Sequence, residues 1–90
     1  MTVARRVRVT GRVQGVFFRA WTRDEAKALG VTGWVRNNDD DSVEAHLEGS
    51  EAAVAKMIDL MAQGPSHARV DNVDVEEVDP EGSARFEVRH

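Results

Sequence analysis

Apolar and polar residues alternate near the start of the chain. Val7 and Val9 fall on one side of an extended segment, and Arg6 and Arg8 fall on the other. Val13 continues the valine side. A period of two residues is typical of a strand with one buried face, so residues 6–10 are predicted to form a β-strand.

The period changes after a short loop. Apolar or small residues then recur at spacings of four, four and three, which is one face of an α-helix: Phe18, Thr22, Ala26 and Leu29. Gly30 suits the left-handed conformation that commonly ends a helix. The pattern therefore predicts a first helix that begins directly after the loop.

The middle of the chain predicts a β-hairpin. Residues 31–37 (VTGWVRN) are rich in β-forming residues, and residues 38–42 (NDDDS) form a polar turn. After the turn, apolar and polar positions alternate again, with the apolar set at Val43, Ala45 and Leu47.

The last third predicts a second helix and two closing strands. Ser50 is a favourable N-cap, Gly64-Pro65 is a stop signal, and the residues between them carry an apolar helical face: Val54, Met57, Ile58 and Met61. Val73 and Val75, then Phe86 and Val88, predict a closing pair of strands around a turn at residues 79–82.

The predicted element order is β-α-β-β-α-β-β. Two helices of similar length with half-apolar strands favour an α+β, ferredoxin-like sandwich, in which both helices pack on one face of an antiparallel sheet. Ninety residues suit one domain over residues 1–90, and a hydrophobic content of 41% is enough for one core.

Composition excludes several classes of protein. The chain has no cysteine, which excludes disulfides, thiolate metal sites and a cysteine nucleophile. No apolar run is long enough to span a membrane, and residues 1–10 lack the apolar core of a signal peptide. We therefore expect a cytoplasmic protein.

The charge is divided unevenly along the chain. Residues 1–36 carry eight of the twelve basic side chains and two acids, a net charge of +6, whereas residues 37–90 carry a net charge of −10. Such a protein can concentrate a small anion at its first third while its remainder repels polyanions. This pattern favours a small anionic ligand over a nucleic acid.

The segment GRVQGVFFR, residues 11–19, is the best candidate for binding that anion. A loop that leads from a strand into a helix points its N–H groups and the positive end of the helix at the same place. Gly11 and Gly15 allow left-handed or crowded backbone. Arg19 lies in the first helical turn, where the helix dipole disfavours a cation unless an anion is bound between the arginine and the loop.

Other polar and aromatic residues have simpler explanations. Trp21, Trp34 and the two phenylalanines could stack on RNA bases, but core packing suits them better. Three consecutive aspartates in a turn point in different directions and predict a solvated turn rather than a metal site. The histidines are scattered and are expected at the surface: His46, His67 and His90. Arg5, Arg6, Arg23 and Arg85 are expected to be surface arginines paired with acids.

Two segments resemble the signatures of a known family. GRVQGVFFR at residues 11–19 and GWVRN at residues 33–37 closely resemble the two signatures of the acylphosphatases, and the match continues through LEG at residues 47–49. The resemblance implies a small enzyme without metal or cofactor that hydrolyses the carboxyl–phosphate bond of an acyl phosphate to a carboxylate and inorganic phosphate.

The resemblance also implies roles for individual residues. Arg19 would bind the phosphate and Asn37 would position the attacking water. The remaining phosphate contacts would come from loop amides at Val13, Gln14, Gly15, Val16, Phe17 and Phe18. Phosphate or sulfate would compete with the substrate, and a monomer is expected. One position departs from the family pattern, because Asp41 stands where a turn glycine is usual.

Two other functions remain open at this point. The first is a non-catalytic domain that binds an anion or carbamoyl phosphate, like the acylphosphatase-like domains of larger hydrogenase-maturation proteins. The second is an RNA-binding module of similar topology. The acidic residues 37–90 and the lack of an aromatic RNA-binding signature argue against the second.

Overall fold

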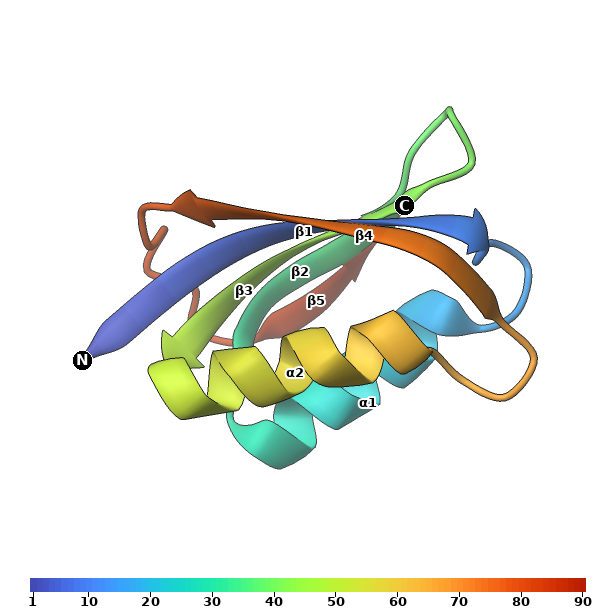
Figure 1. Ribbon diagram of the computed structural model, residues 1–90. Helices are drawn as coiled ribbons and strands as arrows, with labels where there is room; N and C mark the ends of the chain where they lie inside the picture. The colour runs from blue at the N-terminus through green and yellow to red at the C-terminus, as the bar shows by residue number, and fades with distance from the viewer.

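A computed structural model describes all 90 residues. Two helices lie side by side on one face of a single twisted sheet, and the other face carries no helix (Figure 1). The elements along the chain are β1 (Thr2–Arg12), α1 (Phe18–Leu29), β2 (Thr32–Asn37), β3 (Val43–Ser50), α2 (Glu51–Gln63), β4 (Arg69–Val78) and β5 (Phe86–Arg89). The predicted element order and the ferredoxin-like sandwich are confirmed.

The sheet is mixed rather than wholly antiparallel. Its strand order is β4-β1-β3-β2-β5, and three neighbouring pairs are antiparallel, including the predicted β2–β3 hairpin. The fifth strand pairs in parallel with β2, with Phe86 opposite Gly33. The prediction that β4 and β5 pair with each other was wrong, since they form opposite edges of the sheet. The segment between them crosses the ends of three strands instead of making a tight turn.

The core lies between the helices and the facing side of the sheet. Val7 and Val9 are fully buried there, as the alternation predicted, and so are Met57 and Met61 of α2. The predicted helix ends are also confirmed: the Ser50 hydroxyl accepts the N–H of Ala53 at 3.1 Å, and Gly30 is left-handed. This packing fixes α1, and with it the loop that precedes α1, against β2, β5 and α2.

The helix-free face of the sheet is a polar layer that the sequence did not predict. His46 is fully buried on this face, so its expected surface position was wrong. Its ring stacks on Trp34 with the ring centroids 6.0 Å apart. Trp34 is itself buried under the guanidinium groups of Arg6, Arg36 and Arg89. The long side chains and the segment after β4 cover residues that simple alternation would leave exposed.

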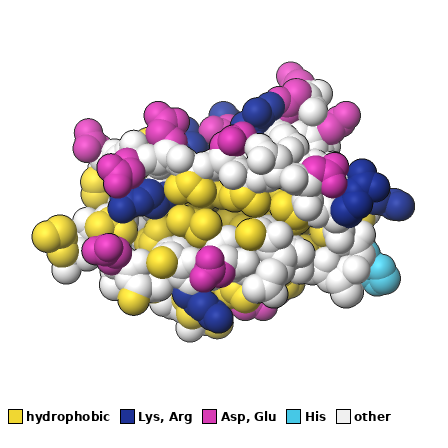
Figure 2. Space-filling view, viewed as in Figure 1, with side chains coloured by type: hydrophobic (Ala, Val, Ile, Leu, Met, Phe, Trp, Pro, Cys, Tyr) yellow, Lys and Arg dark blue, Asp and Glu magenta, His cyan; other side chains and the backbone are white.

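The fold places bases of residues 1–36 beside acids of residues 37–90, as in the Arg5–Glu77 and Arg36–Glu44 ion pairs. Lys and Arg side chains gather where β1 ends and β4 begins, and acidic side chains predominate along the sheet side of the same view (Figure 2). No helix is long and apolar enough to cross a membrane.

Candidate functional site

The loop between β1 and α1 is bent by two residues with left-handed backbone. Gly15 has φ 74, and an added Cβ would meet no atom within 4 Å. The backbone angle therefore favours glycine at this position, and a lack of space does not. Phe17 has φ 62 and is the N-cap residue of α1, with no side chain capping the helix. The N–H groups at this helix end therefore lack a side-chain acceptor, which suits the binding of an anion.

Phe17 contradicts one sequence expectation. Phe17 is 83% exposed, so it does not join the core, whereas Phe18 is 1% exposed and packs as predicted. A left-handed conformation is unfavourable for a residue with a Cβ and is found where the surrounding structure imposes it. No local pattern of residues signals this angle, because it follows from joining the bend at Gly15 to the first turn of α1.

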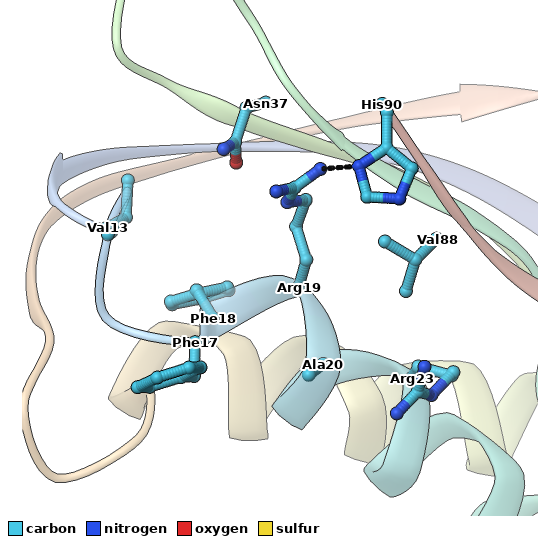
Figure 3. A pocket seen from close by; sticks show the side chains of 10 residues that line it. Val13, Phe17, Phe18, Arg19, Ala20, Arg23, Asn37, Val88 and His90 are labelled. Carbon is cyan, nitrogen blue, oxygen red and sulfur yellow. Dashed lines mark hydrogen bonds between the residues drawn. The ribbon is translucent and has the colours of Figure 1, made fainter.

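Arg19 lies in the first turn of α1, where no acidic residue accompanies it. One guanidinium nitrogen, Nη1, donates to the backbone oxygen of Arg89 at 2.9 Å and lies 3.2 Å from His90 Nδ1. Figure 3 shows the side chain reaching from α1 toward Asn37 and His90. The end of β5 thus holds the arginine in an extended orientation, a contact that the sequence analysis missed.

Arg19 and Asn37 share one cavity. Asn37 is the last residue of β2, and it lines a cavity of about 430 Å³ together with Arg19 and Gly15. Of the other predicted phosphate-binding positions, Val13, Phe17 and Phe18 line the cavity, whereas Gln14 and Val16 do not. The fold therefore brings together Arg19 and Asn37, the last residues of the two signature segments, although the remainder of α1 and most of β2 lie between them in the sequence (Figure 3).

Gln14 has a structural contact that the sequence did not reveal. Its side-chain nitrogen Nε2 donates to the backbone oxygens of Asn38 and Ser42, both at 2.9 Å. These two carbonyls belong to the β2–β3 turn, directly after Asn37. The side chain therefore ties the phosphate-loop candidate to the turn that carries the asparagine.

The β2–β3 turn is also braced from within. Asp41, which stands where the family usually has glycine, adopts a left-handed conformation with φ 72. Hydrogen bonds from the side chain and backbone of Ser42, and then from Arg8, lower the pKa of Asp40 from 3.8 to about 2. The three aspartates are exposed, as predicted for a solvated turn.

One other cluster has metal-ligand chemistry, on the helix-free face of the sheet. Atoms of His46, Glu48 and Glu81 lie within 4.8 Å of one another. The Glu48 carboxylate already accepts backbone N–H groups from residues 81–83, and Arg6 lies 3.5 Å from His46 Nδ1. Several N–H donors and a guanidinium group would oppose a cation there, so these residues suit a structural hydrogen-bond network better than a metal site.

Comparisons with known proteins agree on one family. The family model described as acylphosphatase matches residues 5–88. An acylphosphatase of Rubrobacter xylanophilus is 56% identical over 85 residues, covering 93% of this chain and 77% of the relative. The crystal structure of an acylphosphatase from Bacillus subtilis superposes with a TM-score of 0.95 at 36% identity and covers all of both chains.

A further match concerns a larger protein. Full-length HypF, solved in a phosphate- and nucleotide-bound form, contains a region that superposes on this chain with a TM-score of 0.94 at 27% identity. The match covers 100% of this chain and 12% of HypF. Three comparisons agree: the family model, a relative that is 56% identical, and a superposition over the full chain. This chain therefore belongs to the acylphosphatase family of hydrolases.

Proposed function

We propose that the cavity between the β1–α1 loop and the end of β2 is the catalytic site, in which Arg19 binds the phosphoryl group and Asn37 positions the attacking water. The observation that carries this proposal is that both side chains line one cavity together with the loop at Gly15. Amides of residues 13–18 would complete the phosphate site. The substrate is a small-molecule acyl phosphate, hydrolysed to a carboxylate and inorganic phosphate.

The chemistry of the cavity suits this reaction. A guanidinium group can hold two phosphoryl oxygens at once, and N–H donors that are already positioned stabilise the charge that spreads over those oxygens. The carboxylate leaving group has a conjugate acid with a pKa of ~4, so it departs without a proton donor. A phosphoryl oxygen of the substrate would accept the proton from the attacking water. No acidic side chain lines the cavity, so none repels the phosphoryl group there.

The alternative is a non-catalytic, anion-binding role like that of a domain within a larger protein. The superposition on 12% of HypF gives this alternative its support. Hydrolysis of benzoyl phosphate in the presence of a chelator separates the two, because a binding domain would show saturable phosphate binding without turnover. Loss of turnover on chelation would contradict the expected independence from metals.

Two substitutions test the separate roles of the site residues. Arg19→Gln removes the charge and the guanidinium fork, so it should weaken phosphate binding and nearly abolish turnover. Asn37→Ala leaves the loop and the arginine in place, so phosphate should still bind while kcat falls by roughly 10² or more. Calorimetric titration with phosphate, measured beside kcat, makes the comparison.

Loss of phosphate binding in Asn37→Ala as severe as in Arg19→Gln would contradict the assignment of the water to Asn37. The control is Lys56→Gln, because Lys56 is an exposed residue of α2 that does not line the cavity.

The proposal has four further parts. Phosphate or sulfate competes with the substrate, and residues 1–90 act as one catalytic domain. The protein is a monomer, and its location is cytoplasmic.

A further inference from the structure

The cavity has a part that the phosphate-binding residues do not explain. Beyond Asn37 and the loop it is lined by Ala20 and Arg23 of α1, and by Val88 and His90 at the end of β5. Figure 3 shows Arg19, Ala20 and Arg23 following one another along α1, with Val88 on the side of β5. If the phosphoryl group lies at Arg19 and the loop, these residues adjoin the acyl portion of the substrate.

Arg23 is the charged residue of α1 in this part of the cavity. It lies four residues after Arg19, so both side chains occupy the same face of the helix. Like charges at this spacing repel each other and destabilise a helix slightly, unless an anion lies between or beside them. A second cation on the cavity wall thus favours ligands that carry a second negative charge.

The sequence predicts a surface arginine paired with an acid at Arg23, and the pairing in the structure is weak. Its nearest carboxylate is that of the next residue, Asp24, at 3.3 Å from Nε. The Arg23 and Asp24 side chains are 39% and 69% exposed, and a pair so open to solvent contributes little. The Arg23 contact uses Nε, so the terminal guanidinium nitrogens of Arg23 have no protein partner and remain available to a ligand.

We propose that Arg23 binds an anionic group on the acyl portion of the substrate, so that the preferred substrates are acyl phosphates with a negatively charged acyl group. This inference rests on the proposed function of the cavity. Ala20 and Val88 provide apolar surface along the cavity wall for the carbon chain that joins the two charged ends (Figure 3). Arg23 is then a residue that determines specificity, while Arg19 and Asn37 serve the reaction common to all acyl phosphates.

The test compares two substrates of matched length, succinyl phosphate and butyryl phosphate, which differ by one carboxylate in place of a methyl group. The wild-type protein should have the higher kcat/KM for succinyl phosphate. Arg23→Gln should lower the ratio of kcat/KM between the two substrates by about fivefold, a magnitude at the upper end for an ion pair that remains partly solvated. Because the carboxylate is remote from the reacting bond, the change should appear mainly in KM.

Two control variants accompany the test. Arg85→Gln removes the same charge from a side chain that is 79% exposed and does not line this cavity, so it should leave the ratio unchanged. Arg23→Lys keeps the charge and should retain most of the preference. Glutamine is a good helix former, so Arg23→Gln is expected to fold.

Each outcome decides a different question. If the wild-type protein hydrolyses both substrates with equal kcat/KM, or if Arg23→Gln leaves the ratio unchanged, the proposed role of Arg23 is overturned and the catalytic assignment stands. An equal fall in Arg85→Gln would also overturn it, since the effect would then come from overall charge. If the wild-type protein hydrolyses neither substrate, the proposed function fails and the substrate preference fails with it.

Discussion

Replacing Glu48 with glutamine perturbs the carboxylate that anchors the segment between β4 and β5. The Glu48 side chain is 4% exposed. Its Oε1 accepts the N–H groups of Gly82 and Ser83, both at 3.2 Å. Its Oε2 accepts the N–H of Glu81 and lies 2.6 Å from His46 Nε2. The carboxylate therefore holds a segment that must cross the sheet to place β5 beside β2.

The expected loss of stability follows from these contacts. A hydrogen bond to a charged group contributes about 1.5–3 kcal/mol, and a buried donor left without a partner costs about 1–3 kcal/mol. The amide introduced by Glu48→Gln can keep one acceptor oxygen, but its NH₂ group faces donors that need an acceptor. We therefore expect Glu48→Gln to lower the free energy of unfolding by about 2–3 kcal/mol at pH 7, or the Tm by about 10–20 °C for a domain of this size.

The pH dependence has a defined sign. Burial by itself raises the pKa of Glu48, but hydrogen bonds from the Glu81 N–H, His46 and the Ser83 N–H outweigh it and leave the pKa below its ordinary value. A group with a lowered pKa in the folded state stabilises the protein above its unfolded pKa, about 4.3 for glutamate. This contribution is lost as the pH falls through the lower folded pKa. The difference between wild type and Glu48→Gln should therefore shrink as the pH falls below about 4.

Urea denaturation followed by tryptophan fluorescence measures this effect, because Trp34 stacks on His46 and donates to Glu81 at 3.3 Å. The control is Glu77→Gln, whose carboxylate is 84% exposed and lies 3.6 Å from an Arg5 nitrogen. That change should alter the free energy of unfolding by less than about 0.5 kcal/mol. A Glu48→Gln variant as stable as this control at pH 7 would refute the reasoning, and so would a difference that grows in acid.

Two further substitutions test the backbone. Gly33→Ala should destabilise the fold by at least about 3 kcal/mol or prevent folding, because Gly33 has φ +134 and an added Cβ would lie 1.7 Å from the backbone oxygen of His46. Urea denaturation checks this, and a loss under about 1 kcal/mol would contradict the close approach of β2 and β3. Asp41→Gly should leave stability unchanged or raise it by up to about 1 kcal/mol, since glycine has no Cβ penalty at φ 72. Its turnover of benzoyl phosphate should stay at the wild-type rate, and a large fall in kcat would mean that the turn residue belongs to the site.

Local features of the chain were enough to identify the elements and one residue of the candidate site, Arg19. Period-two and helical spacings identify strands and helices because side-chain direction is a local property of the backbone. Ser50 and Gly30 mark helix ends for the same reason, since capping involves only neighbouring residues. Arg19 was identified because a cation in the first turn of a helix is disfavoured by the helix dipole. Asn37 had no such signal of its own and was identified by its resemblance to a family signature.

The pairing of the strands, in contrast, emerged only from the three-dimensional packing. Phe86 and Val88 fit an antiparallel hairpin with β4 as well as they fit a parallel strand beside β2, because alternation records which face is buried and not which strand is adjacent. The same limit explains His46. Alternation assigns it to the face opposite the core, but the sequence does not reveal that Trp34, the arginines and the segment after β4 cover that face.

The site itself shows the same division. The local sequence of residues 11–19 is suited to binding an anion. That Arg19 and Asn37 line one cavity, however, depends on how α1 packs against β2. The contact of Gln14 with the β2–β3 turn and the position of Arg23 on the cavity wall are likewise long-range. Such contacts depend on how whole helices and strands are placed relative to one another. The packing of the core between the helices and the sheet sets this placement, and no short stretch of sequence encodes it.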